Sequence, residues 1–211
     1  MDLSNPVSTI IPKLDGNIYR VLARTTTPFS GARVAALAGK ASYPGILTAL
    51  RRLVLQGTVL VEQAGSSYMY RANREHILWA AIEQAVAAAE SVLPTLRLRL
   101  SQLVDERLGA TASKDSTLAI FGSVARGTST VDSDLDIVAV FPDYLPEEGG
   151  AELVDALSES TRRWTGNDCN VYVATASRLR ELVEMKDPIV ESWRSDAVTF
   201  HGVDLQDRLT S

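Results

Sequence analysis

The chain has 211 residues, of which 45% are hydrophobic and 22% charged, and its formal net charge is −5. These proportions are ordinary for a folded globular protein, and the length suits one large domain or two small ones. Because there is no apolar run of about eighteen residues and no basic-then-apolar start, we expect no membrane span, no secretory signal and a cytoplasmic location.

Few residues are available for soft-metal sites or nucleophilic catalysis. The single cysteine, Cys169, excludes an internal disulfide and a multi-cysteine zinc site, and its apolar neighbours predict a buried core residue. The two histidines, His76 and His201, lie far apart in the sequence. We therefore interpret them as surface or helix-terminal imidazoles rather than as metal ligands or parts of a serine triad.

The charge is divided unevenly along the chain. Residues 1–75 contain nine Lys/Arg and four Asp/Glu, whereas residues 76–211 contain twelve Lys/Arg and twenty-two Asp/Glu. This division predicts a basic N-terminal module and an acidic C-terminal one.

The N-terminal module has the pattern of three short helices and a hairpin. We expect one helix from about Asp15, a second over residues 31–37, and a third that Ser42 caps. Two runs of alternating apolar and polar residues between residues 58 and 71, separated by a Gly-Ser turn, then predict a β-hairpin.

This order of elements resembles a winged helix-turn-helix domain, and the resemblance rests on layout alone. It implies double-stranded DNA as a partner, with the third helix in the major groove and the hairpin as the wing. The residues expected to contact DNA are Lys40, Ser42, Tyr43, Thr48, Arg51 and Arg52. The alternative is that the same fold serves as a protein-interaction or dimerisation module, with solvated arginines.

Residues 73–110 have a helical composition, rich in Ala, Leu, Glu and Arg. Apolar residues recur there at alternating spacings of four and three, which is typical of a coiled-coil seam or of a helix packed on a domain. Pro94 interrupts the pattern, so we expect a kink or two consecutive helices. A homodimer through this region and packing within one chain are the two alternatives.

Two carboxylates mark the start of a strand within residues 118–140. Two apolar runs there are separated by a turn and a polar loop, and the second run begins at Asp134 and Asp136. Successive side chains of a strand point to opposite faces, so these two aspartates share one face. Paired carboxylates suit Mg²⁺, which prefers oxygen ligands and bridges carboxylates to phosphates. We predict Mg²⁺ on this pair.

The turn before this strand suits a polyphosphate. Gly122 lets the backbone approach a ligand closely, Ser123 supplies a hydroxyl beside free amides, and Arg126 adds a planar set of donors with a fixed charge. A phosphate-binding turn beside metal-binding carboxylates indicates phosphoryl or nucleotidyl transfer.

The run Phe121–Gly127, followed by Ser133–Ile137, resembles the signature of the DNA polymerase beta-like nucleotidyltransferases, particularly the minimal and kanamycin-type members. The resemblance covers roughly residues 116–174 and implies a mixed β-sheet flanked by helices. It also implies a nucleoside triphosphate held by the Gly-Ser turn and two Mg²⁺ ions on the catalytic aspartates of the second run.

The family pattern expects a third acid on the neighbouring strand. Asn170 fills that register here, and the nearest acid on the same face, Asp168, is our candidate for the third catalytic carboxylate. An asparagine offers only a neutral carbonyl ligand and cannot take a proton from an acceptor hydroxyl. Either Asp168 reaches the site, or the second metal ion is held weakly.

These interpretations predict an α+β chain in three parts: a winged helix-turn-helix domain over residues 1–72, a helical connector over 73–110 and a nucleotidyltransferase domain over 111–211. We expect a Mg²⁺-dependent enzyme that moves a nucleoside monophosphate from a triphosphate to a hydroxyl of a protein, an RNA or a small molecule. The alternatives are a transcription regulator whose nucleotidyltransferase-like domain senses a nucleotide, and an antitoxin-type protein that acts on a toxin partner.

Overall fold

The structure, a computed structural model, describes residues 1–39 and 41–210. The chain forms two compact units, one over Asn5–Val92 and the other over Leu93–Ser211 together with Met1–Ser4. This division falls inside the expected connector, residues 73–110, so that its two halves belong to different units. In the described part of the chain, no helix is long and apolar enough to cross a membrane.

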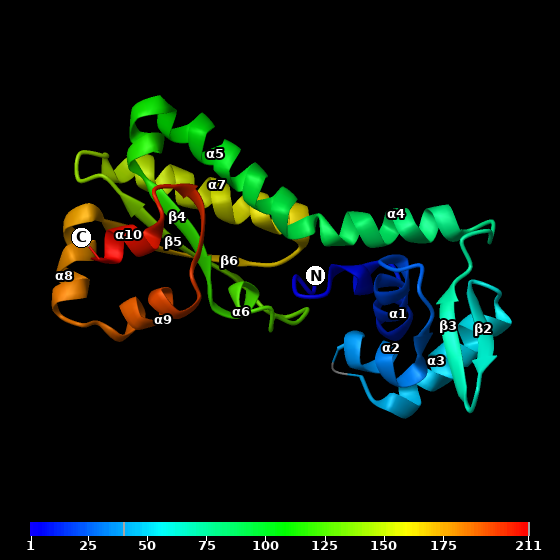
Figure 1. Ribbon diagram of the computed structural model, residues 1–211. Coiled ribbons are helices and arrows are strands. Elements are labelled where there is room, and N and C mark those ends of the chain that lie inside the picture. Colours follow the sequence, from blue (N-terminus) through cyan, green and yellow to red (C-terminus); the bar gives the residue numbers. More distant parts are fainter. Residues whose placement is uncertain (40, 211) are drawn as a thin grey trace. The chain divides into compact units, whose positions relative to one another are not determined.

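The unit Asn5–Val92 combines helices with a small antiparallel sheet (Figure 1). Its elements are η1 (Pro6–Thr9), α1 (Lys13–Ala23), β1 (Phe29–Ser30), α2 (Gly31–Leu37), α3 (Tyr43–Leu55), β2 (Val59–Ala64), β3 (Ser67–Ala72) and α4 (Trp79–Glu90). The strands pair in the order β1-β3-β2. The helices α1 to α3 and the β2-β3 hairpin follow the order expected from the sequence, and their interpretation as a winged helix stays a prediction.

The other unit is built on a mixed sheet of four strands. Its elements are α5 (Val92–Asp115), β4 (Thr117–Phe121), α6 (Gly122–Ala125), β5 (Leu135–Phe141), α7 (Glu147–Thr165), β6 (Cys169–Thr175), α8 (Ala176–Glu184), α9 (Pro188–Asp196), β7 (Val198–Gly202) and α10 (Leu205–Thr210). The strand order is β6-β5-β4-β7, in which only β5 and β6 run parallel. The sequence resemblance implied such a mixed sheet with flanking helices.

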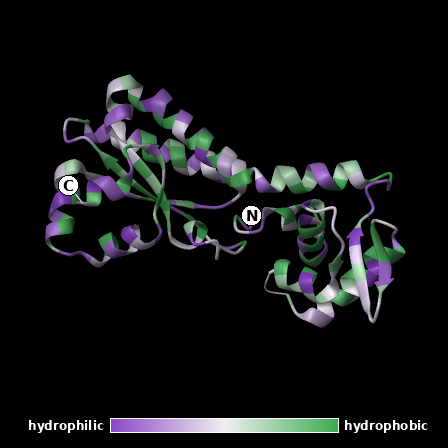
Figure 2. Ribbon diagram, in the orientation of Figure 1, coloured by the Kyte–Doolittle hydropathy of each residue, from purple (hydrophilic) through white to green (hydrophobic). Residues whose placement is uncertain are grey.

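Helices cover both faces of this sheet. In Figure 1, α5 and α7 lie on one side, and α8, α9 and α10 lie on the other. The central strands β4 and β5 are coloured as hydrophobic along most of their length in Figure 2. Ile120, Ile137 and Val138 are completely buried there, as is Trp193 of α9. Burial on both faces explains why these strands are continuous apolar runs, and it makes them a rigid base for the residues at their ends.

Two consecutive helices occupy the region around Pro94, as expected. The helix α4 ends at Glu90 and α5 begins at Val92, so the proline lies in the first turn of α5. A proline costs little there, because the amide that it lacks has no intrahelical partner. A second break lies within α5 at Gly109, whose φ is +70°.

His201 is buried, with 8% of its surface exposed, which corrects the expectation of a surface or helix-terminal imidazole. Its Nδ1 lies 2.8 Å from Ser101 Oγ, and its Nε2 lies 3.0 Å from the carbonyl oxygen of Ser113. The Ser113 hydroxyl also donates to Asp105. This network joins β7 to α5, because buried polar groups require partners.

The end of β7 accepts only a glycine. Gly202 has a φ of +76°, and a Cβ atom on it would lie 1.9 Å from the carbonyl oxygen of Ser116. We expect Gly202→Ala to lower the free energy of unfolding by about 3 kcal/mol, since left-handed strain adds to a clash with backbone. Urea titration followed by circular dichroism measures this change. In the matched control Gly166→Ala, φ is also +76° but no atom lies within 4 Å. An equal loss in the two variants would contradict the steric argument.

Candidate active site

Strand pairing brings three residues side by side at one end of the sheet. Asp136 of β5 lies opposite Phe121 of β4 and opposite Asn170 of β6. Paired residues on adjacent strands point to the same face, so the Asp136 carboxylate and the Asn170 amide are neighbours. Asp134 lies two positions before Asp136, and the strand period of two gives its side chain the same face.

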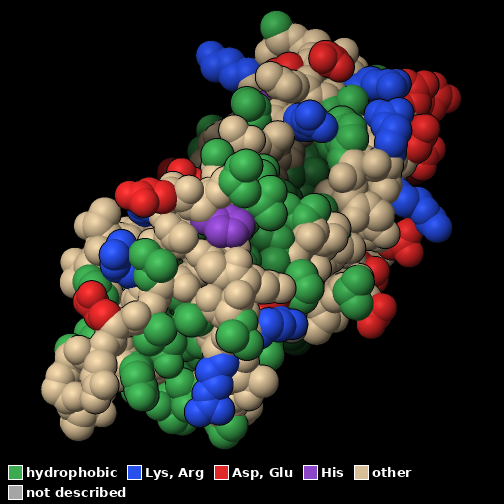
Figure 3. Space-filling view, turned by 90° about the vertical axis from the view of Figure 1, so that its right-hand side faces the viewer, with side chains coloured by type: hydrophobic (Ala, Val, Ile, Leu, Met, Phe, Trp, Pro, Cys, Tyr) green, Lys and Arg blue, Asp and Glu red, His purple; other side chains and the backbone are tan. Residues whose placement is uncertain are grey.

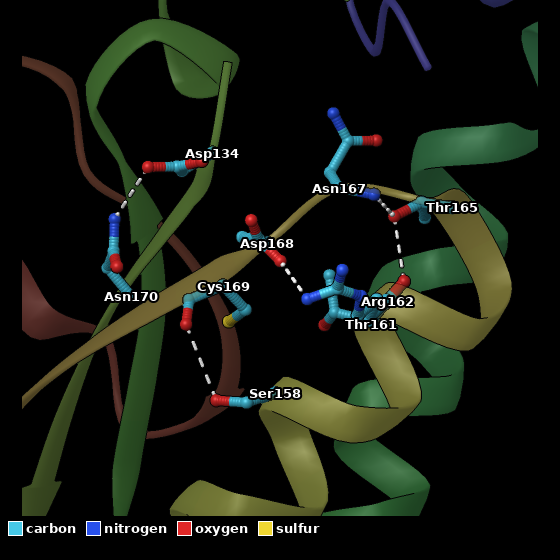
Figure 4. Close-up of polar contacts among 9 residues, drawn as sticks. All are labelled: Asp134, Ser158, Thr161, Arg162, Thr165, Asn167, Asp168, Cys169 and Asn170. Carbon is cyan, nitrogen blue, oxygen red and sulfur yellow. Dashed lines mark hydrogen bonds and ion pairs between the residues drawn. The ribbon is translucent and has the colours of Figure 1, made fainter. Parts of the chain in front are cut away.

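The amide of Asn170 joins the two carboxylates. Its Nδ2 donates to Asp134 Oδ2 at 3.0 Å and lies 3.4 Å from Asp136 Oδ1. Figure 4 shows the Asn170 side chain pointing toward Asp134. Two anionic oxygens thus converge on one neutral donor. Across residues 1–39 and 41–210, no group of three or more His, Cys, Asp or Glu side chains could hold a metal ion.

Asp168 points to a different partner. Its Oδ1 accepts from the Arg162 guanidinium of α7 at 2.9 Å, and 65% of its side chain is exposed. The ion pair is drawn in Figure 4. The structure therefore places Asn170, and not Asp168, against Asp134 and Asp136.

The Gly122 backbone lies close to the Asp136 carboxylate, and its expected approach to a ligand stays a prediction. Its φ is +74°, and a Cβ atom at this position would lie 2.6 Å from Asp136 Oδ2. A side chain here would therefore displace the carboxylate or the turn. Where the sequence predicts a Gly-Ser turn, the backbone forms the short helix α6, Gly122–Ala125. Ser123 lies in its first turn, and its carbonyl oxygen accepts from the Thr128 amide at 2.9 Å.

Asp196, the last residue of α9, is a residue that the sequence reasoning missed. Its Oδ1 accepts from the Gly122 backbone N–H at 3.3 Å, and its Oδ2 pairs with the Arg126 guanidinium. Only 7% of the Asp196 side chain is exposed, compared with 50% for Arg126. One local feature of the sequence could have singled out Asp196: it is an acid at the C-terminal end of a helix, where the helix dipole disfavours a negative charge.

Hydrogen bonds from residues that the sequence analysis did not single out also hold the loop that leads to Asp134. The Asn167 amide Nδ2 donates to the carbonyl oxygen of Ser133 at 2.8 Å and to that of Met1 at 3.0 Å. The Ser129 backbone N–H donates to Ser4 Oγ at 2.8 Å. These bonds hold the approach to the carboxylate pair without any contact with the carboxylates themselves.

Cys169 takes no part in this site, and it is half-buried rather than the buried core residue that the sequence predicted. Its side chain lies on the other face of β6 from Asn170, toward α7 (Figure 4). Burial raises the pKa of the Cys169 thiol to about 11, and the charges of Asp136 and Asp134 act in the same direction. The group is therefore a neutral thiol near pH 7, which suits neither a nucleophile nor a metal ligand.

Several residues of α3 that were predicted to contact DNA have structural partners. Ser42 Oγ accepts from the Gly45 amide at 3.3 Å as the helix cap, and the Thr48 hydroxyl donates to the Pro44 carbonyl at 3.0 Å. The Arg52 guanidinium pairs with Asp15 of α1. Lys40 lies outside the described residues.

Tyr43 and Arg51 line a groove of about 800 Å³ in the same unit. Most of its remaining lining is apolar or aromatic: Ala32, Leu47, Val54, Leu55, Val61, Tyr68 and Tyr70. Figure 3 shows a face of the molecule on which exposed hydrophobic side chains lie near basic ones. A groove of this composition carries less positive charge than the sequence alone suggested.

Comparison with known proteins bears on the half of the chain that carries the carboxylate pair. The model of the nucleotidyltransferase domain family matches residues 99–203, a range that includes β4, β5, β6 and β7. The match supports the nucleotidyltransferase superfamily for this region, and such a domain suggests transfer of a nucleoside monophosphate. No curated protein matches the chain.

Proposed function

We propose that this protein is a Mg²⁺-dependent nucleotidyltransferase that moves a nucleoside monophosphate from a nucleoside triphosphate to a hydroxyl group. The observation that carries the proposal is the convergence of Asp134 and Asp136 on the Asn170 amide, at 3.0 and 3.4 Å, beside a glycine that leaves no room for a side chain. The family match over residues 99–203 supports the same class of reaction.

The side chains at this site fit one Mg²⁺ ion. Mg²⁺ takes oxygen ligands and is commonly bound by one or two carboxylates together with substrate phosphates and water. Asp134 and Asp136 would hold it, and the Asn170 amide can rotate to present its oxygen as a neutral ligand. When bound, such an ion neutralises charge on the phosphates and lowers the pKa of an oxygen that it contacts.

The chain's own residues have separate tasks in the transfer. The acceptor oxygen forms a bond to the α-phosphorus, and the bond from that phosphorus to pyrophosphate breaks. Of the side chains in contact here, the carboxylates of Asp134 and Asp136 can take the hydroxyl proton, and the amide of Asn170 cannot. Ser123 and Arg126 would bind the phosphates. The acceptor belongs to one of three classes: a protein, an RNA or a small molecule.

Pyrophosphate release tests the proposal. Purified protein is incubated with Mg²⁺, each of the four ribonucleoside triphosphates and candidate acceptors, including a cell lysate, and the control is the double variant Asp134→Asn/Asp136→Asn. We expect release by the wild type above that of the control, with label transferred from an α-labelled triphosphate. Equal release by both proteins across the acceptors would overturn the proposal.

Asn170 favours a second candidate function, in which the site binds a nucleotide with little turnover. The chain would then be a transcription regulator that senses a nucleotide, or an antitoxin-type binder of a partner protein. In either case, binding of a nucleotide with Mg²⁺ would change an affinity of the chain. For a regulator this is the affinity for DNA, and for an antitoxin-type binder it is the affinity for a partner protein encoded beside it. Fluorescence anisotropy with labelled double-stranded DNA, with and without Mg²⁺ and each triphosphate, distinguishes the regulator from the enzyme.

DNA binding by the unit Asn5–Val92 is itself a proposal, and Arg51, an exposed arginine of α3 that lines the groove, is the residue chosen to test it. We expect Arg51→Ala to weaken binding to double-stranded DNA and to lower the slope of log affinity against log salt by about one, as for the loss of one phosphate contact. The control is Arg107→Ala, which removes an exposed arginine of α5. If the two variants bind DNA alike, Arg51 does not contact DNA, and the groove beside it serves another purpose.

A further inference from the structure

Asp196 is the feature that the proposed function leaves unexplained. A single buried carboxylate accepts a hydrogen bond from the Gly122 backbone N–H, at an N–O distance of 3.3 Å, and pairs with the Arg126 guanidinium. Gly122 is the first residue of α6, and Arg126 directly follows its last. Asp196 therefore ties both ends of the proposed phosphate-binding turn to one group, and that group is supplied by α9 at the far end of the domain sequence.

Aromatic side chains pack closely around the helix that carries Asp196. One turn earlier on α9, Trp193 is completely buried, and its ring lies edge-on to Phe121, the residue before Gly122, at a centroid distance of 6.3 Å. Tyr172, two residues along β6 from Asn170, meets the same ring at 5.1 Å. The helix that carries Asp196 is thus packed against the strands that carry the site.

The buried charge of Asp196 limits how Arg126 can bind a phosphate. The Asp196 side chain is only 7% exposed, so releasing Arg126 to a phosphate would leave a buried carboxylate without its cationic partner at the C-terminal end of a helix, which is unfavourable. A guanidinium has five N–H donors, and the Arg126 side chain is 50% exposed. Arg126 can therefore bind a phosphate with its remaining donors while it stays on Asp196.

We propose that Asp196 is a positioning residue for the triphosphate: it fixes the Gly122–Arg126 turn and aims the free donors of Arg126 at the phosphate chain. This proposal rests on the proposed nucleotidyltransferase function. In this proposal Arg126 binds Asp196 and the phosphate chain at the same time, and Asp196 does not contact the nucleotide. Loss of Asp196 should then weaken the binding of a long phosphate chain more than that of a nucleoside monophosphate.

Calorimetric titration with ATP and with AMP, each with Mg²⁺, tests this assignment on the full-length wild type, Asp196→Asn, Arg126→Ala and the double variant. We expect Asp196→Asn to weaken ATP binding about tenfold, the usual worth of one charge-assisted contact, with AMP binding unchanged. In the Arg126→Ala background, Asp196→Asn should weaken ATP binding little further, because the guanidinium that Asp196 positions is absent. The matched control is Glu191→Gln, an exposed acid of the same helix, which should bind ATP like the wild type.

The outcomes separate this proposal from the function on which it rests. Unchanged ATP binding by Asp196→Asn, or an equal loss for ATP and AMP, overturns the positioning role alone. Should the wild type bind another ribonucleoside triphosphate in place of ATP, that nucleotide and its monophosphate replace ATP and AMP in the experiment. A wild type that binds none of the four triphosphates overturns both proposals. Should Asp196→Asn fail to fold, as judged by its melting curve, Arg126→Lys tests the same point. It keeps a positive charge beside Asp196 but replaces the planar group of five donors with a compact ammonium of three, and ATP binding as tight as in the wild type would overturn the proposal.

Discussion

Replacing Asn170 with aspartate is expected to raise the rate of Mg²⁺-dependent pyrophosphate release by about a hundredfold, the usual contribution of a positioned general base. The side chain at this position already touches the carboxylates of Asp134 and Asp136, at 3.0 and 3.4 Å. Aspartate has the same size, so it would place a third anionic oxygen where a metal ligand or a base acts. Single-turnover assays with a saturating triphosphate measure the change directly.

The same substitution should alter stability in a metal-dependent way. Without Mg²⁺, three carboxylates in contact repel one another, so Asn170→Asp should melt at a lower temperature than the wild type. Added Mg²⁺ should restore the melting temperature. The control Gln102→Glu makes the same change of charge on an exposed position of α5 and should show neither effect. A variant that matches the wild type in rate and in metal response would show that position 170 does not limit the chemistry.

Replacing Gly122 with alanine is expected to weaken binding of a Mg²⁺-loaded triphosphate about a hundredfold, which corresponds to about 2.7 kcal/mol. The left-handed backbone, with a φ of +74°, costs a non-glycine residue about 1–2 kcal/mol. The new methyl group would also lie 2.6 Å from Asp136 Oδ2, so it must push this carboxylate or the turn aside. Calorimetry gives the affinity, and a melting curve gives the cost to folding.

The control Gly166→Ala separates the two contributions to this loss. Gly166 also has a left-handed backbone, with a φ of +76°, but no atom lies within 4 Å of the added methyl group. It ends α7 and does not touch the carboxylate pair. We expect it to lower stability and to leave triphosphate binding unchanged. Equal affinities of Gly122→Ala and the wild type would mean that the turn does not approach the phosphates.

The strands of the site could be predicted because their local sequence pattern is distinctive. The run at residues 118–121 and the run after Asp134 are apolar, short and bounded by polar loops, and the observed β4 and β5 differ from them by a single residue at most ends. The period of two along a strand then gave the shared face of Asp134 and Asp136 without any tertiary information. The position of Asn170 in the expected third-acid register agrees with the pairing of Asp136 and Asn170.

Contacts between segments far apart in the chain could not be predicted from the sequence. The ion pair from Arg126 to Asp196 spans 70 residues, and the bond from Asn167 to Met1 spans 166. Neither pair has a local periodic signal, because its two members lie far apart in the sequence and are brought together by the tertiary fold. His201 illustrates the same limit: its burial depends on polar partners from α5 that lie about a hundred residues earlier.

The central claim, that Asp134 and Asp136 hold the metal ion of a bound nucleoside triphosphate, is tested most directly by calorimetric titration of the wild type and of Asp134→Asn/Asp136→Asn with each triphosphate, with and without Mg²⁺. The predicted result is a saturable isotherm for the wild type that requires Mg²⁺, and none for the double variant at the same concentrations, with both proteins folded by circular dichroism. Equal, Mg²⁺-independent binding by the two proteins would contradict the claim.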